Sequence, residues 1–197
     1  ALEAGSNGLD LANDIGPGLA KAAIAVSVNG IQQDLCDSIN EDSEVSIITT
    51  DSDEGLEIMR HTLTAQVLAR AVKNLYPDAK LAIGPTIKDG FYYDFEFVKS
   101  ITPDDLEKIE KEMQKIISSK SAITKKLHSK KDALNVFSSI GESYKESIIN
   151  ESGQEDNFQL YYQEDNAFVD LCRGPHLPSL KHIGAFKLTK LAGAYWK

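Results

Sequence analysis

Apolar side chains recur along residues 56–75 at the spacing of one face of an α-helix. The main stripe has one member every four residues, and three further apolar residues widen it. The stripe consists of Met59, Leu63, Val67, Ala71 and Leu75, and the residues beside it are Leu56, Leu68 and Val72. Because a stripe this wide has to be buried, the sequence predicts a long helix that packs against other parts of the chain and ends before Pro77.

Further helices and strands are expected after this helix. The segments Thr102–Asp105 and Ser129–Asp132 each combine a capping residue with an acid three positions later, which is typical of a helix start. The buried stripe expected of the first is Leu106, Ile109, Met113, Ile116 and Ile117. Residues 81–97 predict two strands around a loop, while residues 159–172 and 184–196 predict strands and loops.

The N-terminal quarter has a different pattern. Residues 8–15 are amphipathic, and Gly-Pro-Gly at residues 16–18 predicts a break. A hairpin turn is expected at Asn29-Gly30 between two apolar runs. The predicted strands are residues 22–28, 31–35 and 44–49. With a linker near residue 50, the sequence predicts an α+β chain in two domains, 1–50 and 51–197.

Charge is divided unevenly along the chain. Residues 1–57 hold twelve acids and one base, a charge of −11 against −9 for the whole chain. No acid follows Asp170, and five basic residues do: Arg173, Lys181, Lys187, Lys190 and Lys197. A second basic group consists of Lys120, Lys125, Lys126, Lys130 and Lys131. Such clusters can bind a polyanion even in an acidic protein, and the alternative is that they are solvated surface lysines.

No apolar run approaches the length of a membrane span, and the N-terminus lacks the basic and apolar regions of a signal peptide. Two cysteines, Cys36 and Cys172, are too few for a disulfide scaffold. We therefore expect a cytoplasmic protein with no membrane partner.

The stretch Asp170-Leu-Cys172-Arg-Gly-Pro-His176 is the main candidate for chemistry. Three interpretations are open on the residues alone. The thiol can lie buried beside a turn, it can be a nucleophile with His61 as its base, or His61, Cys172 and His176 can bind zinc.

Longer stretches carry a resemblance to a known family. They are "GLEIMRHTLTAQVLARAVKNLYPDAKLAIGPTIKDGFYYDFEF", "GESYK", "FVDLCRGPHLP" and "FKLTKLAGAYW". Their order and spacing resemble the N-terminal half of bacterial threonyl-tRNA synthetases. The resemblance implies a small β-grasp-like (TGS) domain at 1–50, where "ALEAGSNG" replaces the expected opening hairpin and the sheet is expected to be incomplete. It implies an editing domain at 51–197, in which a long helix packs on an antiparallel sheet. The aminoacylation core and the anticodon domain are expected to lie outside this sequence.

The resemblance also implies a function, which is hydrolysis of mischarged Ser-tRNA(Thr) by attack of water on the aminoacyl ester. Threonine and serine differ by one methyl group, which a binding pocket distinguishes by only about 1–3 kcal/mol. A second site is therefore needed to remove serine. The implied partners are the tRNA(Thr) acceptor end and the serine or threonine aminoacyl group, and the full protein is expected to be a homodimer through the core.

The family's editing pocket joins a His-x3-His motif on the long helix to a Cys-x3-His motif. Cys172, His176 and Asp170 match the second motif, and Lys145 matches a pocket lysine. The first motif is altered, because the helix contains one extra residue. Aligned on the residues before the motif, the two histidine positions fall on His61 and Ala65. Aligned on the residues after it, they fall on Thr62 and Gln66. The catalytic set expected is His61, Gln66, Lys145, Asp170, Cys172 and His176. The residues expected to bind tRNA at the cleft mouth are Arg173, Lys181, Lys187 and Lys190.

The extra residue leads to a prediction about the helix. Residues five apart on an α-helix point about 140° away from each other, whereas an i to i+5 turn absorbs one residue. We expect such a turn between Arg60 and Gln66, with His61 and Gln66 on one face, His176 accepting the proton and Gln66 holding the water.

Two alternatives keep the same fold. One is a catalytically weakened module that binds the tRNA acceptor end, since glutamine is a poor proton acceptor. The other is a zinc-dependent hydrolase of the alanyl type, which would use His61, Cys172 and His176 as ligands. For editing we expect no metal and no cofactor in this region, with ATP and zinc confined to the core.

Overall fold

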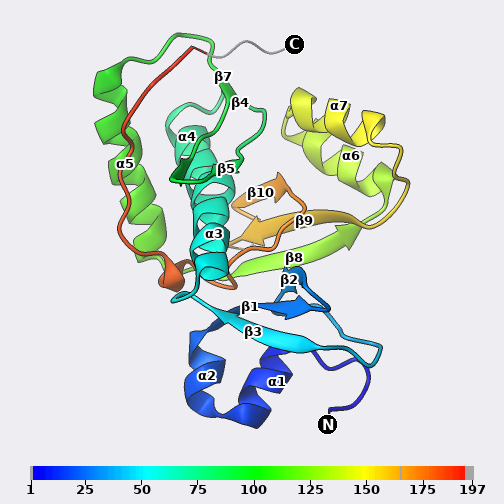
Figure 1. Ribbon diagram of the computed structural model, residues 1–197. Helices are drawn as coiled ribbons and strands as arrows, with labels where there is room; N and C mark the ends of the chain where they lie inside the picture. Colours follow the sequence, from blue (N-terminus) through cyan, green and yellow to red (C-terminus); the bar gives the residue numbers. More distant parts are fainter. Residues whose placement is uncertain (1, 165, 194–197) are drawn as a thin grey trace.

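The computed structural model describes residues 2–164 and 166–193 (Figure 1). It mixes helices with antiparallel sheets, so the predicted α+β class is confirmed. The "GAYW" ending lies, after Gly193, outside the described residues. No helix within the described ranges is long and apolar enough to cross a membrane.

The N-terminal part is a three-stranded sheet covered by two short helices. Strand β1 (Ala23–Val28) lies between β2 (Ile31–Asp34) and β3 (Val45–Thr49). Asn29 and Gly30 join β1 to β2 with φ values of 50° and 82°, the left-handed conformation that this turn requires. Helices α1 (Gly8–Ile15) and α2 (Pro17–Ala22) cover one face of the sheet, where Ala12 packs on Val26 and Val28.

Gly-Pro-Gly at 16–18 is a junction between two helices rather than a simple break. Helix α1 ends at Gly16, and Pro17 begins α2 because a proline is accommodated in the first turn, where its missing N–H has no partner to lose. Strand β1 therefore starts at Ala23, one residue later than predicted.

The long helix forms as predicted, in three segments: α3 (Asp53–Thr62), η1 (Leu63–Leu68) and α4 (Ala69–Leu75). Segment η1 is π-helical, and the Ala69 N–H bonds the Thr64 carbonyl five residues earlier. The expected i to i+5 turn is confirmed, although it begins at Leu63 rather than at Arg60.

The wide turn lets both ends of the helix keep an apolar face in the core. Leu63, Val67 and Val72 are buried against α5 (Pro103–Ser118), which contributes Ile109, Met113 and Ile116. The expectation for the helix ends was wrong, because Leu56 and Leu75 are both 39% exposed. Ile58 is buried in place of Leu56.

A second antiparallel sheet has the order β10-β9-β8, formed by β8 (Ile123–His128), β9 (Phe158–Gln163) and β10 (Phe168–Leu171). Helices α6 (Lys130–Ser139) and α7 (Ser143–Glu151) cover one face, against Phe158, Leu160 and Tyr162. The long helix lies on the other face, where Ala69 meets Phe168. The layers are thus α5, the long helix, the sheet, and α6 with α7 (Figure 1).

Residues 80–96 form one hairpin whose two arms are interrupted, so the expected pair of strands around a loop is confirmed in outline. Strand β4 (Lys80–Leu81) pairs with β7 (Phe95–Glu96), and β5 (Thr86–Ile87) pairs with β6 (Gly90–Phe91). The tail contains the 3-10 turn η2 (Leu180–His182), and its described residues after that turn hold no strand.

A shared core joins the two parts of the chain. Ile58 of α3 packs with Ile24 of β1, Ile48 of β3 and Leu177 of the tail. The chain turns tightly there, since a Cβ on Gly55 would lie 1.9 Å from the Thr49 carbonyl oxygen. The division into domains at residue 50 stays a prediction, and this contact makes the two parts neighbours across a buried surface.

Candidate active site

A cleft of about 380 Å³ opens between the long helix, α7 and β10. The residues from the predicted site that line it are His61, Lys145, Asp170, Cys172 and Arg173. Its remaining wall is mostly apolar and includes Ala65, Ile83, Pro85, Ile148, Phe158 and Leu171. The cleft therefore combines a few polar groups with apolar walls, as binding sites for small organic groups do.

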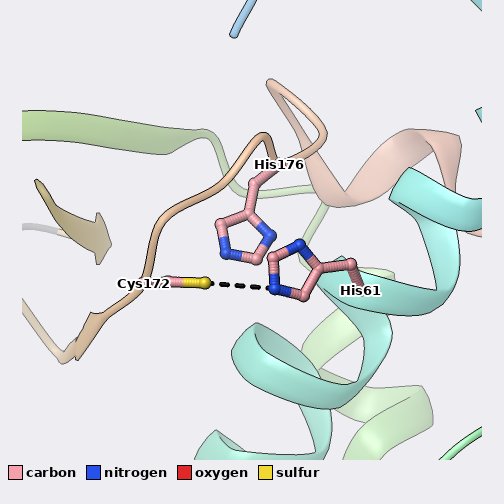
Figure 2. Close-up of side chains that lie close together, drawn as sticks. All are labelled: His61, Cys172 and His176. Carbon is pink, nitrogen blue, oxygen red and sulfur yellow. Dashed lines mark hydrogen bonds between the residues drawn. The ribbon is translucent and has the colours of Figure 1, made fainter. Parts of the chain in front are cut away.

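His61 and Cys172 meet in this cleft (Figure 2). His61 Nε2 lies 3.1 Å from Cys172 Sγ, and His61 Nδ1 lies 3.3 Å from the carbonyl oxygen of Pro175. A carbonyl can only accept, so Nδ1 carries the proton in this contact and Nε2 presents a lone pair to the thiol. The geometry thus gives His61 the tautomer of a proton acceptor.

Burial lowers the pKa of His61 below its usual value, and the hydrogen bond to the Pro175 carbonyl partly opposes this effect. The imidazole is therefore mainly neutral at pH 7, with its Nε2 lone pair directed at Cys172 Sγ on the cleft wall.

His176 lies behind His61 rather than in the open cleft. The two rings are 4.4 Å apart between centroids, and His176 is only 2% exposed. Its Nδ1 lies 3.2 Å from Thr62 Oγ1, while its Nε2 has no hydrogen-bond partner among the residues described. The structure thus brings His176 to the site as a second imidazole with one buried, unpaired nitrogen.

Lys145 and Asp170 form a buried ion pair in the cleft wall. Lys145 Nζ lies 2.8 Å from Asp170 Oδ1, with the two side chains 5% and 2% exposed. Tyr93 OH accepts from Lys145 at 3.3 Å and donates to Asp170 Oδ2 at 3.4 Å. Burial raises the pKa of Asp170, and the Lys145 ammonium opposes this shift. Burial, together with the Asp170 charge, also raises the pKa of Tyr93 well above its usual value, so the phenol stays protonated.

Gln66 is not in the cleft, and its predicted place beside His61 was wrong. Gln66 is fully buried on the sheet side, where Gln163 Nε2 donates to its Oε1 at 3.0 Å and to its backbone carbonyl at 2.8 Å. Because the wide turn begins only at Leu63, the residue that shares the cleft with His61 is Ala65, four positions on. The altered motif is therefore His61-x3-Ala65.

The basic residues expected at the cleft mouth divide into two groups. Arg173 lines the cleft, whereas Lys181, Lys187 and Lys190 do not. Lys187 was placed wrongly, because its Nζ pairs with Glu110 Oε2 at 2.6 Å on α5. The C-terminal segment runs along α5 (Figure 1), where the Leu188 N–H donates to Glu110 Oε1 at 2.6 Å.

The two histidines and the thiol could also bind a metal ion. Their donor atoms lie within 4.8 Å of one another. Three protein ligands and a water suffice for a catalytic zinc ion, so the set has the minimum number of donors. Ala65 adds no fourth ligand.

Sequence reasoning missed three residues of the site. Tyr93 was assigned only to a strand, and Thr62 appeared only as a register alternative, although its hydroxyl contacts His176. Asp34 was counted only as part of the N-terminal charge, although it bonds the His176 backbone N–H. Residue type alone gives no signal for such contacts between distant segments.

Comparisons with known proteins agree with this architecture. Residues 1–49 match the TGS domain, and residues 159–194 match the threonyl and alanyl tRNA synthetase second additional domain. The chain is 50% identical over 189 residues to the threonine--tRNA ligase of Hahella chejuensis, covering 96% of this chain and 29% of that protein. The corresponding ligase of Ehrlichia canis is 47% identical over 193 residues, which is 98% of this chain and 30% of the relative.

By the domain matches and the relatives, the chain is similar to an accessory region of an aminoacyl-tRNA synthetase. The chain corresponds in particular to the N-terminal region of bacterial threonyl-tRNA synthetases. It spans less than a third of the length of the relatives it matches.

Proposed function

We propose that the cleft hydrolyses the ester bond between serine and the 3′ end of mischarged tRNA(Thr). The observation that carries the proposal is that the His61 lone pair and the buried Lys145–Asp170 pair share one cleft. Hydrolysis of an aminoacyl ester needs a proton acceptor for the attacking water and a positive group near the ester oxygens. The side chains of the cleft supply both.

In the proposed reaction His61 Nε2 takes a proton from water as the water oxygen bonds to the carbonyl carbon. Lys145 stabilises the negative charge that develops on the carbonyl oxygen. The bond from carbon to the ribose oxygen then breaks, and the imidazolium returns the proton to that leaving oxygen. The products are free serine and uncharged tRNA.

Two features of the cleft support an aminoacyl ester as substrate. Asp170 gives the site a fixed negative group for a substrate ammonium or hydroxyl, and apolar residues such as Ile83 and Pro85 line the remaining wall. Arg173, on the cleft wall, would contact a phosphate of the tRNA acceptor end. The hydrolysis requires no cofactor in this proposal.

Further proposals concern the longer protein. We expect ATP and a zinc ion to bind the aminoacylation core, and two copies to associate through that core.

The experiment compares three properties of the complete protein: hydrolysis of seryl-tRNA(Thr) in a single turnover, tRNA binding, and sensitivity to a zinc chelator. We expect hydrolysis well above the spontaneous rate, its loss in His61→Ala with tRNA binding retained, and no effect of the chelator. Normal tRNA binding without hydrolysis would favour the weakened binding module. Loss on chelation with recovery on adding zinc would favour the zinc-dependent alternative.

A further inference from the structure

Asp34, at the end of β2, is a buried carboxylate whose bonds reach out of its own sheet. It is 7% exposed and contacts three groups of the editing-type part. Lys125 Nζ donates to Oδ2 at 2.9 Å, Tyr161 OH donates to the same oxygen at 2.6 Å, and the His176 backbone N–H donates to Oδ1 at 2.9 Å. One side chain of the N-terminal sheet thus bonds the segment that carries Cys172 and His176.

The contacts of Asp34 fix both the backbone and the ring of His176. The backbone is held directly by the N–H bond to Oδ1. The ring is held through Tyr161, whose own ring meets the imidazole edge-on at 90° with centroids 4.5 Å apart. The Tyr161 hydroxyl is itself hydrogen-bonded to Asp34. Asp34 therefore positions His176 in two ways, through its backbone N–H and through the Tyr161 ring.

The backbone between Cys172 and His176 is fitted closely against this pair. Gly174 has φ +66°, and a Cβ there would lie 2.0 Å from the Tyr161 hydroxyl and 3.1 Å from Asp34 Oδ2. The segment therefore rests directly on the Asp34–Tyr161 hydrogen bond. A shift of Asp34 would be passed to the two residues that face His61.

If Asp34 served only to join the two parts of the chain by an ion pair, its bonds to Tyr161 and to the His176 N–H would not be needed. Lys125 also pairs with Asp37, which lies in the turn after β2 and bonds the Asp34 N–H. Asp37 therefore provides the same cross-sheet charge contact without bonding residues 172–177. Replacing each acid in turn therefore distinguishes two roles. Both acids hold the two sheets together, but only Asp34 also holds His176.

We propose that Asp34 is a positioning residue of the hydrolytic site, supplied by the TGS sheet, which orients His176 against His61 and Cys172. Its effect on rate rests on the function proposed above, whereas its effect on the His176 backbone does not. The TGS domain then serves the reaction by holding the catalytic wall in place, without contacting the substrate.

The test uses the complete protein with Asp34→Ala, and with Asp37→Asn as the matched control that keeps an oxygen for the Asp34 N–H. Amide hydrogen exchange at His176 reports the bond directly. We expect exchange at least tenfold faster in Asp34→Ala and unchanged in Asp37→Asn. Unchanged protection of the His176 amide in Asp34→Ala would overturn the proposal.

The kinetic arm measures hydrolysis of seryl-tRNA(Thr). We expect kcat to fall about 10- to 100-fold in Asp34→Ala with KM within twofold, because His176 packs on the ring of His61, the proton acceptor, and its displacement moves that ring while the substrate contacts remain. Asp34→Asn, which keeps an oxygen for the His176 N–H, should retain most of the rate. An equal loss of kcat in Asp37→Asn would show that packing between the sheets is responsible instead.

Tyr161→Phe is a second variant, which tests the proposal even if Asp34→Ala fails to fold. It removes the hydroxyl that anchors the ring and leaves the His176 N–H bond, so we expect lower kcat with normal exchange at that amide. Normal kcat in Tyr161→Phe would contradict the ring-orienting half of the proposal. If the unaltered protein hydrolyses no seryl-tRNA, the proposed function fails, and the exchange experiment still decides whether Asp34 holds His176.

Discussion

His61 Nε2 and Cys172 Sγ lie 3.1 Å apart, although 111 residues separate them in the sequence. The pair has the geometry of a base beside a thiol, so it raises the question of whether sulfur or water attacks the ester. The proposed reaction uses water, with the thiol as part of the cleft wall.

Replacing Cys172 separates these two mechanisms. We expect Cys172→Ala to keep measurable hydrolysis of seryl-tRNA(Thr), because His61 and Lys145 remain. Hydroxylamine should then trap no serine on the unaltered protein. Complete loss in Cys172→Ala together with a trapped acyl group would show that sulfur is the nucleophile. Cys36→Ala is the control, since Cys36 is exposed and does not line the cleft.

The depressed pKa of His61 predicts how rate and stability depend on pH. Neutral imidazole is needed to accept a proton, so the rate should stay level down to pH 6.5, the usual histidine pKa, and should decline only at the lower pKa of His61. Between these two pKa values the histidine of the unfolded chain binds more protons than that of the folded chain. The free energy of unfolding therefore falls as pH falls through this window. The decline at low pH is measured from rates at a series of pH values, corrected for spontaneous hydrolysis, with His61→Ala as control. A decline that begins above pH 6.5 would contradict the prediction.

The Lys145–Asp170 pair should be more sensitive to losing one partner than to losing both. Lys145→Met leaves a carboxylate buried without its cation, and such a change typically costs about 3–5 kcal/mol. The double variant Lys145→Met/Asp170→Leu leaves no charge and should lose less than the sum of the single variants. Urea denaturation of all four proteins gives the coupling free energy. Strict additivity would mean that the two groups do not interact.

The choice of helix register can be tested by placing a histidine at each of two adjacent positions. Ala65→His adds an imidazole four residues after His61 on the cleft side, completing four potential zinc ligands with Cys172 and His176. Gln66→His points at the sheet and loses the hydrogen bond from Gln163. We expect zinc affinity to rise at least tenfold in Ala65→His and not in Gln66→His. Zinc titration with the purified variants measures it, and the reverse order would contradict the register.

The wide turn could be predicted because the apolar residues before and after it fix two helical faces that one extra residue would otherwise misalign. The direction of Gln66 could not, because it depends on where the turn begins and on Gln163, which lies 97 residues away. Lys187 was misplaced for a similar reason, since its partner Glu110 belongs to another helix.

Strand β8 and helix α7 are among the elements that were not predicted. Strand β8 carries Lys125, which is largely buried only because Asp34 and Asp37 meet it there. In the sequence the same lysine is indistinguishable from a solvated one. Burial of a charged residue depends on its partner, and that partner lies in the N-terminal sheet.

Removal of serine from tRNA(Thr) by this cleft can be tested by single-turnover hydrolysis of seryl-tRNA(Thr) and threonyl-tRNA(Thr), with the complete protein and with His61→Ala. We expect rapid hydrolysis of the seryl ester, much slower hydrolysis of the threonyl ester, and loss of the seryl reaction in His61→Ala. Equal rates for the two esters, or a seryl rate that does not change in His61→Ala, would contradict this expectation.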